Sequence, residues 1–333
     1  MTGGCCLFPR VLAAIAGASL MAAAIPAGAD PFVKGDIFAS IGSGNVNHYS
    51  ADGSFLETLN IGTGGFTTGM AFDGDGNLYV TGFSANTIAK FDTDGNLVDG
   101  NFITSAGGLS TPESIVFDKT GNIFVGNLGT GIQKYGSGGA FIGNVVPDRV
   151  DWLDLSADQS TFFFTGEGST INTVSNALPG VDGPAFAGGL TQGFALRLLG
   201  DGGLLVADNI NVKRFDSSGN LIQSYDTSGT GVDGWFALNL DPDGTSFWSG
   251  SFADGILRKF DIDSGSVLQS IDTTLDGGCA GNCLFGVAVA GEITQGGPGP
   301  GTVPEPSSLA LMGGGLAGLW FVVRRKRIAM GHS

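Results

Sequence analysis

Short segments in which apolar and polar residues alternate recur along most of the chain, separated by glycine-containing turns. Residues 70–80 and 115–125 are the clearest copies: an apolar segment, a turn ending in Gly-Asn, and a second apolar segment. This alternation predicts half-buried β-strands, and the turns predict hairpins, because glycine and asparagine accept positive φ. Weaker copies follow at residues 153–164, 195–206 and 238–248.

A second kind of hairpin follows the first in most copies. It occurs at residues 88–97, 132–141, 212–221 and 257–267, with an early copy at residues 46–55 and an eroded one at residues 171–174. Two hairpins in each repeat of roughly 40 to 45 residues predict a four-stranded sheet. Phe72, Tyr79, Ile88 and Phe91 make such a sheet apolar on both faces, so it must stack against copies of itself.

The two ends of the repeat region are each incomplete. Residues 36–40 supply part of a first hairpin, and residues 285–292 supply a lone strand after the sixth repeat. Together they complete one sheet and close a ring, which removes the exposed edges of an open array. We therefore expect an all-β fold, a six-bladed β-propeller over residues 30–293 that is closed by strands from both termini.

The turn Phe-Asp-x-x-Gly-Asn-Leu/Ile-x-Val carries a resemblance to known propellers. Through it, residues 36–292 resemble NHL-type and gluconolactonase-like six-bladed propellers. The motif is typical of the fold and says little about activity.

The N-terminus reads as a secretory signal over residues 1–29. Arg10 precedes an apolar run at residues 11–25, and Ala27-Gly28-Ala29 forms an Ala-x-Ala cleavage site. Cys5 and Cys6 precede that run, whereas a lipoprotein cysteine follows it. We expect a signal helix that is removed on export.

The C-terminus has three parts in a fixed order. After a Gly/Pro linker at residues 294–302, the tail at residues 303–333 gives Pro304-Glu305-Pro306, an apolar run at residues 309–323, and four cations, Arg324, Arg325, Lys326 and Arg327. The prolines favour an extended segment, the run predicts a single hydrophobic helix slightly short of the ~20 residues that span a bilayer comfortably, and the cations favour the cytoplasmic side.

This order resembles the PEP-CTERM sorting signal of Gram-negative bacteria over residues 303–327. The resemblance implies processing by an exosortase near Pro304-Glu305-Pro306, transient anchoring in the inner membrane, and export to the cell surface or extracellular matrix. A tail anchor that is never cleaved is the alternative.

Composition adds charge to this picture. The chain has 59 glycines and a formal net charge of −16, and residues 30–303 hold 30 acidic and 10 basic residues, a net charge of −20. Such a surface repels phosphate backbones, so we expect no nucleic-acid partner. The charge suits solubility, or attraction of cations and basic ligands.

Few residues suit catalysis by histidine or thiol. His48 is the one histidine before the tail, and it occupies the repeat position filled elsewhere by Lys90, Lys134 and Arg214, so we expect a repeat residue rather than a catalytic base. Cys279 and Cys283 flank a short loop, for which export favours a disulfide over a zinc site.

Acidic residues gather in two settings. Asp73 and Asp92 begin Asp-x-Asp-Gly-Asn segments that lack the distal glutamate of a calcium loop, so turn chemistry explains them. The alignment of repeats also places polar residues around one mouth of the central channel. They are Glu113, Asn127, Asp151, Glu167, Gln192, Asp208, Asn209 and Asp233.

Carboxylate and amide oxygens are ligands that suit calcium, so calcium is the one cofactor that these residues suggest. In gluconolactonase-like propellers a comparable ring holds a catalytic metal, and the resemblance here is partial: Thr111-Pro112-Glu113-Ser114 is similar to that family's entry turn. Polar mouth residues without a bound ion are the simpler interpretation.

Two functions follow from these patterns. The first is a noncatalytic propeller that binds a ligand, extracellular polysaccharide or protein, with Trp152, Trp235 and Phe236 either stacking on it or packing between blades. The second is a metal-dependent lactonase or ester hydrolase that uses the acidic mouth.

Overall fold

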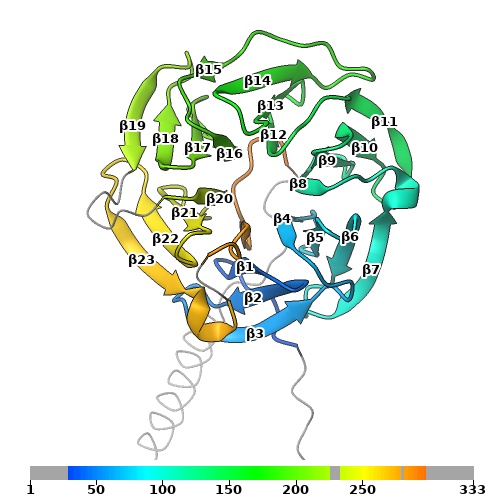
Figure 1. Ribbon diagram of the computed structural model, residues 1–333, viewed down its shortest axis with the longest axis vertical. Helices are drawn as coiled ribbons and strands as arrows, with labels where there is room; N and C mark the ends of the chain where they lie inside the picture. Colours follow the sequence, from blue (N-terminus) through cyan, green and yellow to red (C-terminus); the bar gives the residue numbers. More distant parts are fainter. Residues whose placement is uncertain (1–28, 226–232, 279–280, 298–333) are drawn as a thin grey trace, which may run out of the picture.

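The computed structural model describes residues 29–225, 233–278 and 281–297. These residues form six four-stranded antiparallel sheets arranged as blades around a central axis (Figure 1). They contain no α-helix, only the two short 3-10 helices η1 (Ser105–Gly107) and η2 (Thr273–Asp276). The predicted six-bladed propeller is confirmed, whereas the predicted signal helix and C-terminal helix lie outside the described residues.

Each blade runs from an innermost strand at the axis to an outermost strand at the rim. Blade one is β24 (Gly286–Val289), β1 (Ile37–Gly42), β2 (Asn45–Tyr49) and β3 (Phe55–Asn60). Blade two is β4 (Thr67–Phe72), β5 (Leu78–Gly82), β6 (Thr87–Phe91) and β7 (Leu97–Thr104). Blade three is β8 (Pro112–Phe117), β9 (Ile123–Asn127), β10 (Gly131–Tyr135) and β11 (Phe141–Val146).

The remaining three blades repeat this order. Blade four is β12 (Leu153–Leu155), β13 (Thr161–Phe164), β14 (Thr170–Ser175) and β15 (Ala187–Gly188). Blade five is β16 (Gly193–Leu198), β17 (Leu204–Asp208), β18 (Asn211–Phe215) and β19 (Leu221–Tyr225). Blade six is β20 (Trp235–Leu240), β21 (Ser246–Ser251), β22 (Ile256–Asp261) and β23 (Val267–Asp272). The repeat predicted to be most eroded, blade four, has an outermost strand of only two residues.

The turns inside the blades are built as the sequence predicts. In the first of them the Asp73 carboxylate accepts hydrogen bonds from the backbone N–H groups of Asp75 and Asn77, at 3.0 and 2.9 Å, and Gly76 has φ +86°. Asp92 does the same for Asp94 and Asn96. The first carboxylate of each Asp-x-Asp-Gly segment, Asp73 or Asp92, is thus engaged in holding its own turn.

The ring closes through the pairing that the two incomplete ends predict. β24 pairs antiparallel with β1, with Ile37 opposite Val289 and Ser40 opposite Gly286. Most of the core lies between blades, and at the closure Val287 packs in a buried cluster with Trp248 and Leu257 of blade six. Closure therefore joins the last described strand both to the first blade by hydrogen bonds and to the sixth by packing.

Val287→Ala should lower the free energy of unfolding by about 1–3 kcal/mol, because Val287 is 1% exposed and its lost methyl groups leave a cavity at the closure. Val267→Ala is the matched control on the outermost strand of blade six. Val267 is 45% exposed, so its replacement should cost no more than about 0.5 kcal/mol. Urea unfolding measures both, and equal losses would contradict the closure described here.

Candidate functional site

The central axis has two distinct ends. The innermost strands β4, β8, β12, β16, β20 and β24 begin at one face of the disc, here called the mouth face, and end at the other, the strap face. The strap is the segment at residues 291–297 that follows β24. Figure 1 shows it crossing the central opening toward β12.

A β-bulge lies near the start of four innermost strands. The register shifts between Thr67 and Met70 in β4 and between Pro112 and Ser114 in β8; equivalent shifts occur between Gly193 and Leu196 in β16 and between Trp235 and Ala237 in β20. A bulge re-aims a side chain out of the ladder. Three residues within these shifts, Thr68, Glu113 and Phe236, line a pocket at the mouth.

This mouth pocket has a volume of about 240 Å³. Its lining comes from five of the six blades and their connections, and comprises Phe66, Thr68, Phe83, Glu113, Leu128, Glu167, Phe236 and Phe285. The rings of Phe66 and Phe236 both contact that of Phe285 edge-on, with centroids 5.4 Å away in each case. Aromatic carbon therefore forms much of the wall, and carboxylates form the polar part.

The acidic cluster, defined as Glu113, Asp151 and Glu167, surrounds one guanidinium group. Arg149 Nη2 lies 3.0 Å from Asp151 Oδ1 and 2.7 Å from Glu167 Oε1. Glu113 Oε2 and Asp151 Oδ2 are buried and have no hydrogen-bond partner among the described residues. Three carboxyl groups thus share one cation.

Burial dominates the acid–base behaviour of this cluster. Burial, followed by repulsion from Asp151, raises the pKa of Glu113 well above its ordinary value. Burial also raises the pKa of Asp151 to about 6, although Arg149 opposes that shift. The two carboxyl groups therefore hold a proton into a pH range in which exposed carboxyl groups are ionised.

The other predicted mouth residues hold loops. The Asn127 side-chain amide donates to the carbonyls of Val125 and Gly131. Asp208 accepts from the backbone N–H groups of Thr191 and Gln192, each at 2.7 Å, and pairs with Lys213.

Two further predicted residues lie apart from the acidic cluster. Asn209 accepts hydrogen bonds from the N–H groups of Gly234 and Trp235 through its carbonyl, and the Asp233 residue is exposed. Gln192 reaches the cluster, with Nε2 lying 3.4 Å from Glu167 Oε2. The structure thus brings four of the eight predicted mouth residues together, namely Glu113, Asp151, Glu167 and Gln192, and does not form one ring.

No group of three or more His, Cys, Asp or Glu side chains is arranged for metal binding within the described ranges. Arg149 occupies the position beside Asp151 and Glu167 that a cation would need. Calcium binding stays a prediction.

His48 is buried inside blade one rather than at the mouth. Its Nε2 lies 2.9 Å from Asp36 Oδ2, and its ring stacks on Phe38 with centroids 4.5 Å apart. Lys90 occupies the same place over Tyr79 in blade two, 5.0 Å from the ring centroid. The position of His48 in the repeat therefore accounts for its presence inside the blade.

The three aromatic residues considered for stacking on a ligand lie in two different environments. Trp152 and Trp235 are buried and pack in the cluster between blades, so the interpretation that they stack on sugars or peptides is wrong. Phe236 packs in the same cluster and also lines the mouth pocket.

The strap closes the opposite end of the axis. Arg197 Nε donates to Glu292 Oε1 at 2.8 Å and to Asn239 Oδ1 at 2.6 Å, and the Leu240 N–H donates to the same Glu292 oxygen. Gln159 Nε2 donates to the carbonyl of Gly296 at 2.7 Å. The first residues of the predicted Gly/Pro linker are therefore docked on the propeller.

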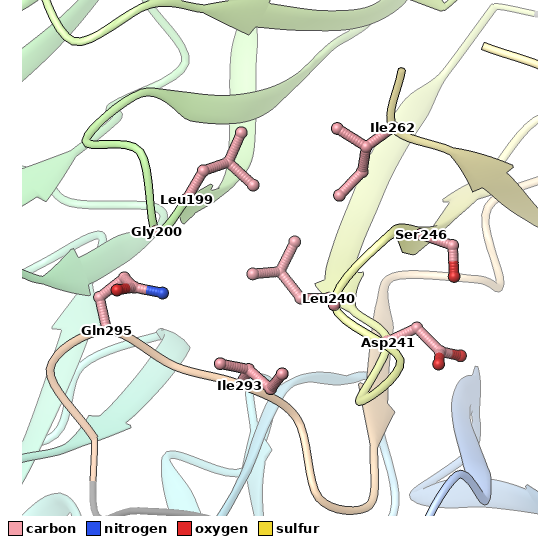
Figure 2. Close-up of a pocket in the computed structure, with 9 residues that line it drawn as sticks. Leu199, Gly200, Leu240, Asp241, Ser246, Ile262, Ile293 and Gln295 are labelled. Carbon is pink, nitrogen blue, oxygen red and sulfur yellow. The ribbon is translucent and has the colours of Figure 1, made fainter. Parts of the chain in front are cut away.

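A smaller pocket of about 170 Å³ lies where the strap passes blades five and six. Figure 2 shows Ile293 and Gln295 of the strap on one side and Leu199 and Ile262 on the other, with Leu240 between them. Its apolar lining fits packing of the strap.

Two further predictions concern residues at the limits of the structure. Cys283 is disulfide-bonded, and its predicted partner Cys279 lies outside the described residues. The sorting residues Pro304, Glu305, Pro306, Arg324, Arg325, Lys326 and Arg327 also lie outside them. No helix in the described part of the chain is long and apolar enough to cross a membrane.

The sequence alone did not identify Arg149 or most of the aromatic wall. Phe66 and Phe285 each precede an innermost strand, which is a signal the repeat alignment contains. Arg149 lies in the connection between blades three and four, where the alignment of repeats selects Asp151 but not Arg149, so only the folded chain places it beside Glu167.

Comparison with protein families identifies one segment of the chain. The PEP-CTERM protein-sorting motif matches residues 302–327. The motif implies an exported protein that is sorted by an exosortase and transiently held at the membrane of a Gram-negative bacterium. No curated protein matches the sequence.

Solved structures share the fold at low sequence identity. A chain of a nidogen/laminin complex is 14% identical with a TM-score of 0.62, covering 76% of this chain and 97% of that one. The gluconolactonase XC5397 from Xanthomonas campestris is 16% identical with a TM-score of 0.56, covering 67% and 84%. The WD40 propeller domain of Doa1 is 17% identical with a TM-score of 0.53, covering 81% and 92%. These similarities show the propeller fold.

The free energy of unfolding should fall as pH rises from 5 to 8. Glu113 and Asp151 have raised pKa values in the folded state, so between those pH values the folded chain binds more protons than the unfolded chain. Glu113→Gln, which is neutral at every pH, should make this decline shallower, because one of the two groups that bind the extra proton is removed.

Asp94→Asn, on an exposed turn, is the control and should leave the profile unchanged. Urea unfolding at several pH values measures the three proteins. A Glu113→Gln profile parallel to that of the wild type would contradict the coupling of these carboxyl groups.

Proposed function

We propose that this protein is an exported, exosortase-sorted component of the bacterial cell surface or extracellular matrix whose propeller binds a ligand in the mouth pocket without catalysis. The observation that carries the binding role is the pocket itself, which combines an aromatic wall with buried carboxylate oxygens that lack a partner. Ligand sites are typically apolar cavities with a few convergent polar groups.

The position of the strap supports the assignment of the ligand site to the mouth face. Glu292 is fixed by Arg197, and Gly296 lies beside Leu155 of β12. The described chain, which precedes the sorting motif in the sequence, therefore ends at the strap face. A ligand, such as part of an extracellular polysaccharide or protein, would approach the opposite, mouth face.

A metal-dependent lactonase or ester hydrolase is the second candidate. The raised pKa values of Glu113 and Asp151 favour it, since acid–base catalysts have such shifted values. The neighbouring Arg149 disfavours it, because a guanidinium bonded to Asp151 and Glu167 competes with a metal ion for both carboxylates.

Blocking the pocket tests the binding role. Leu128→Trp should fill part of the cavity, and a thermal-shift screen of small molecules should then lose the hits obtained with the wild type. Leu268→Trp, on the exposed rim of blade six, is the matched control and should keep them.

Lactone hydrolysis by the wild type with added calcium, abolished by chelation and by Glu113→Ala, would establish the hydrolase instead. Hits that persist in Leu128→Trp would place binding elsewhere on the protein.

The sorting motif predicts a defect in processing. Replacement of Pro304, Glu305 and Pro306 with alanine removes the fixed backbone and the carboxylate of the motif, so the unprocessed chain should accumulate in the inner membrane. Membrane fractionation and intact mass in the native host measure this. The control Pro298→Ala with Pro300→Ala alters only the linker and should be processed normally; equal processing of both variants would contradict exosortase recognition of the motif.

A further inference from the structure

The mouth pocket presents an uneven balance of charge to a ligand. Glu113, Asp151 and Glu167 surround a single cation, Arg149, whose contacts are to Asp151 and Glu167. Glu113 is only 4% exposed, and its Oε2 has no hydrogen-bond partner among the described residues. A buried carboxyl oxygen without a donor destabilises the folded protein, so a ligand that donates there makes a hydrogen bond that the protein itself leaves unmade.

The remaining lining residues determine which kind of hydrogen-bond donor the mouth pocket can accommodate. Phe66, Phe83, Phe236 and Phe285 supply rings, and Leu128 supplies an aliphatic side chain. The hydroxyl of Thr68 is already hydrogen-bonded to Thr81, with Oγ1 atoms 2.7 Å apart.

A calcium ion requires six to eight oxygen ligands, which a wall made mainly of carbon does not offer. The same wall stabilises a bound organic cation in two ways. The apolar body of the cation is removed from water, and the faces of aromatic rings attract its charge. An anion would be repelled by the acidic cluster, whereas a bound ammonium ion would favour release of the proton that Glu113 and Asp151 otherwise hold.

We propose that the mouth pocket binds a small organic ammonium ion, with its charged head against Glu113 and Glu167 and its apolar body among Phe66, Phe236 and Phe285. This inference rests on the proposed function of the pocket as a ligand site and names the class of ligand. The volume of about 240 Å³ suits a molecule smaller than a typical drug, of which benzylamine is a simple representative.

Isothermal titration calorimetry of the exported protein, purified from its host, tests the assignment. Benzylamine is the probe, and benzyl alcohol is its uncharged counterpart of the same shape. Benzylamine should bind at least tenfold more tightly than benzyl alcohol. Glu113→Gln should weaken benzylamine about tenfold and change benzyl alcohol less than twofold, whereas the control Glu57→Gln, on the outermost strand of blade one, should change neither.

Three results would overturn the assignment. Equal affinity for the two probes, or equal effects of Glu113→Gln on both, would leave a ligand pocket that does not select ammonium ions. Absence of benzylamine binding would remove the ligand class, and the thermal-shift screen with Leu128→Trp then decides the proposed function separately. Displacement of benzylamine by stoichiometric calcium chloride would assign the acidic cluster to a metal.

Discussion

A blade of this protein buries its two apolar faces only against neighbouring blades, so every sheet depends on a complete ring. Because the first strand of the propeller, β1, is the second strand of its blade, the ring is complete only when β24 pairs with β1. Residues from opposite ends of the propeller thus share one sheet, and the cluster around Val287 joins that sheet to blade six. The β24–β1 pairing is the interaction on which the remaining structure depends.

The mouth pocket is a consequence of that closure. Phe66 precedes blade two and Phe285 precedes the closing strand, and their rings meet only because the ring is shut. Bulges near the starts of β8 and β20 then bring Glu113 and Phe236 into the same cavity. At the other end of the axis the strap, held by the Glu292–Arg197 pair, crosses the opening. The propeller is accordingly asymmetric, with a pocket at one face and the strap at the other.

Much of the fold follows from local sequence. The Asp-Gly and Gly-Asn turns are specified by residues such as Asp73 and Gly76, whose carboxylate contacts and positive φ need only a few neighbouring residues. The spacing of the repeats and the two partial hairpins at their ends were enough to predict the closing strand. Blade four was correctly expected to be irregular.

The candidate site was predicted less completely, for a physical reason. Repeat alignment assigns a residue to a position near the axis, but not the direction of its side chain, so Asn127 and Asp208 could not be distinguished from Glu113. Both are engaged by loop amides that belong to other parts of the chain. Arg149 lies in a connection between blades, and the strap follows the sixth repeat. Their contacts with Glu167, Arg197 and Gln159 join segments distant in sequence, which alternation and turn patterns do not contain. The charge balance of the pocket therefore became evident only in three dimensions.

Hydrogen–deuterium exchange at β24 and β1 tests the closure most directly, because it reports whether the backbone pairing persists in solution. The account predicts that amides at residues 37–40 and 286–289 exchange as slowly as those of the internal innermost strand β8. Rapid exchange of both segments, with β8 still protected, would show an open ring and would contradict the closure from which the mouth pocket follows.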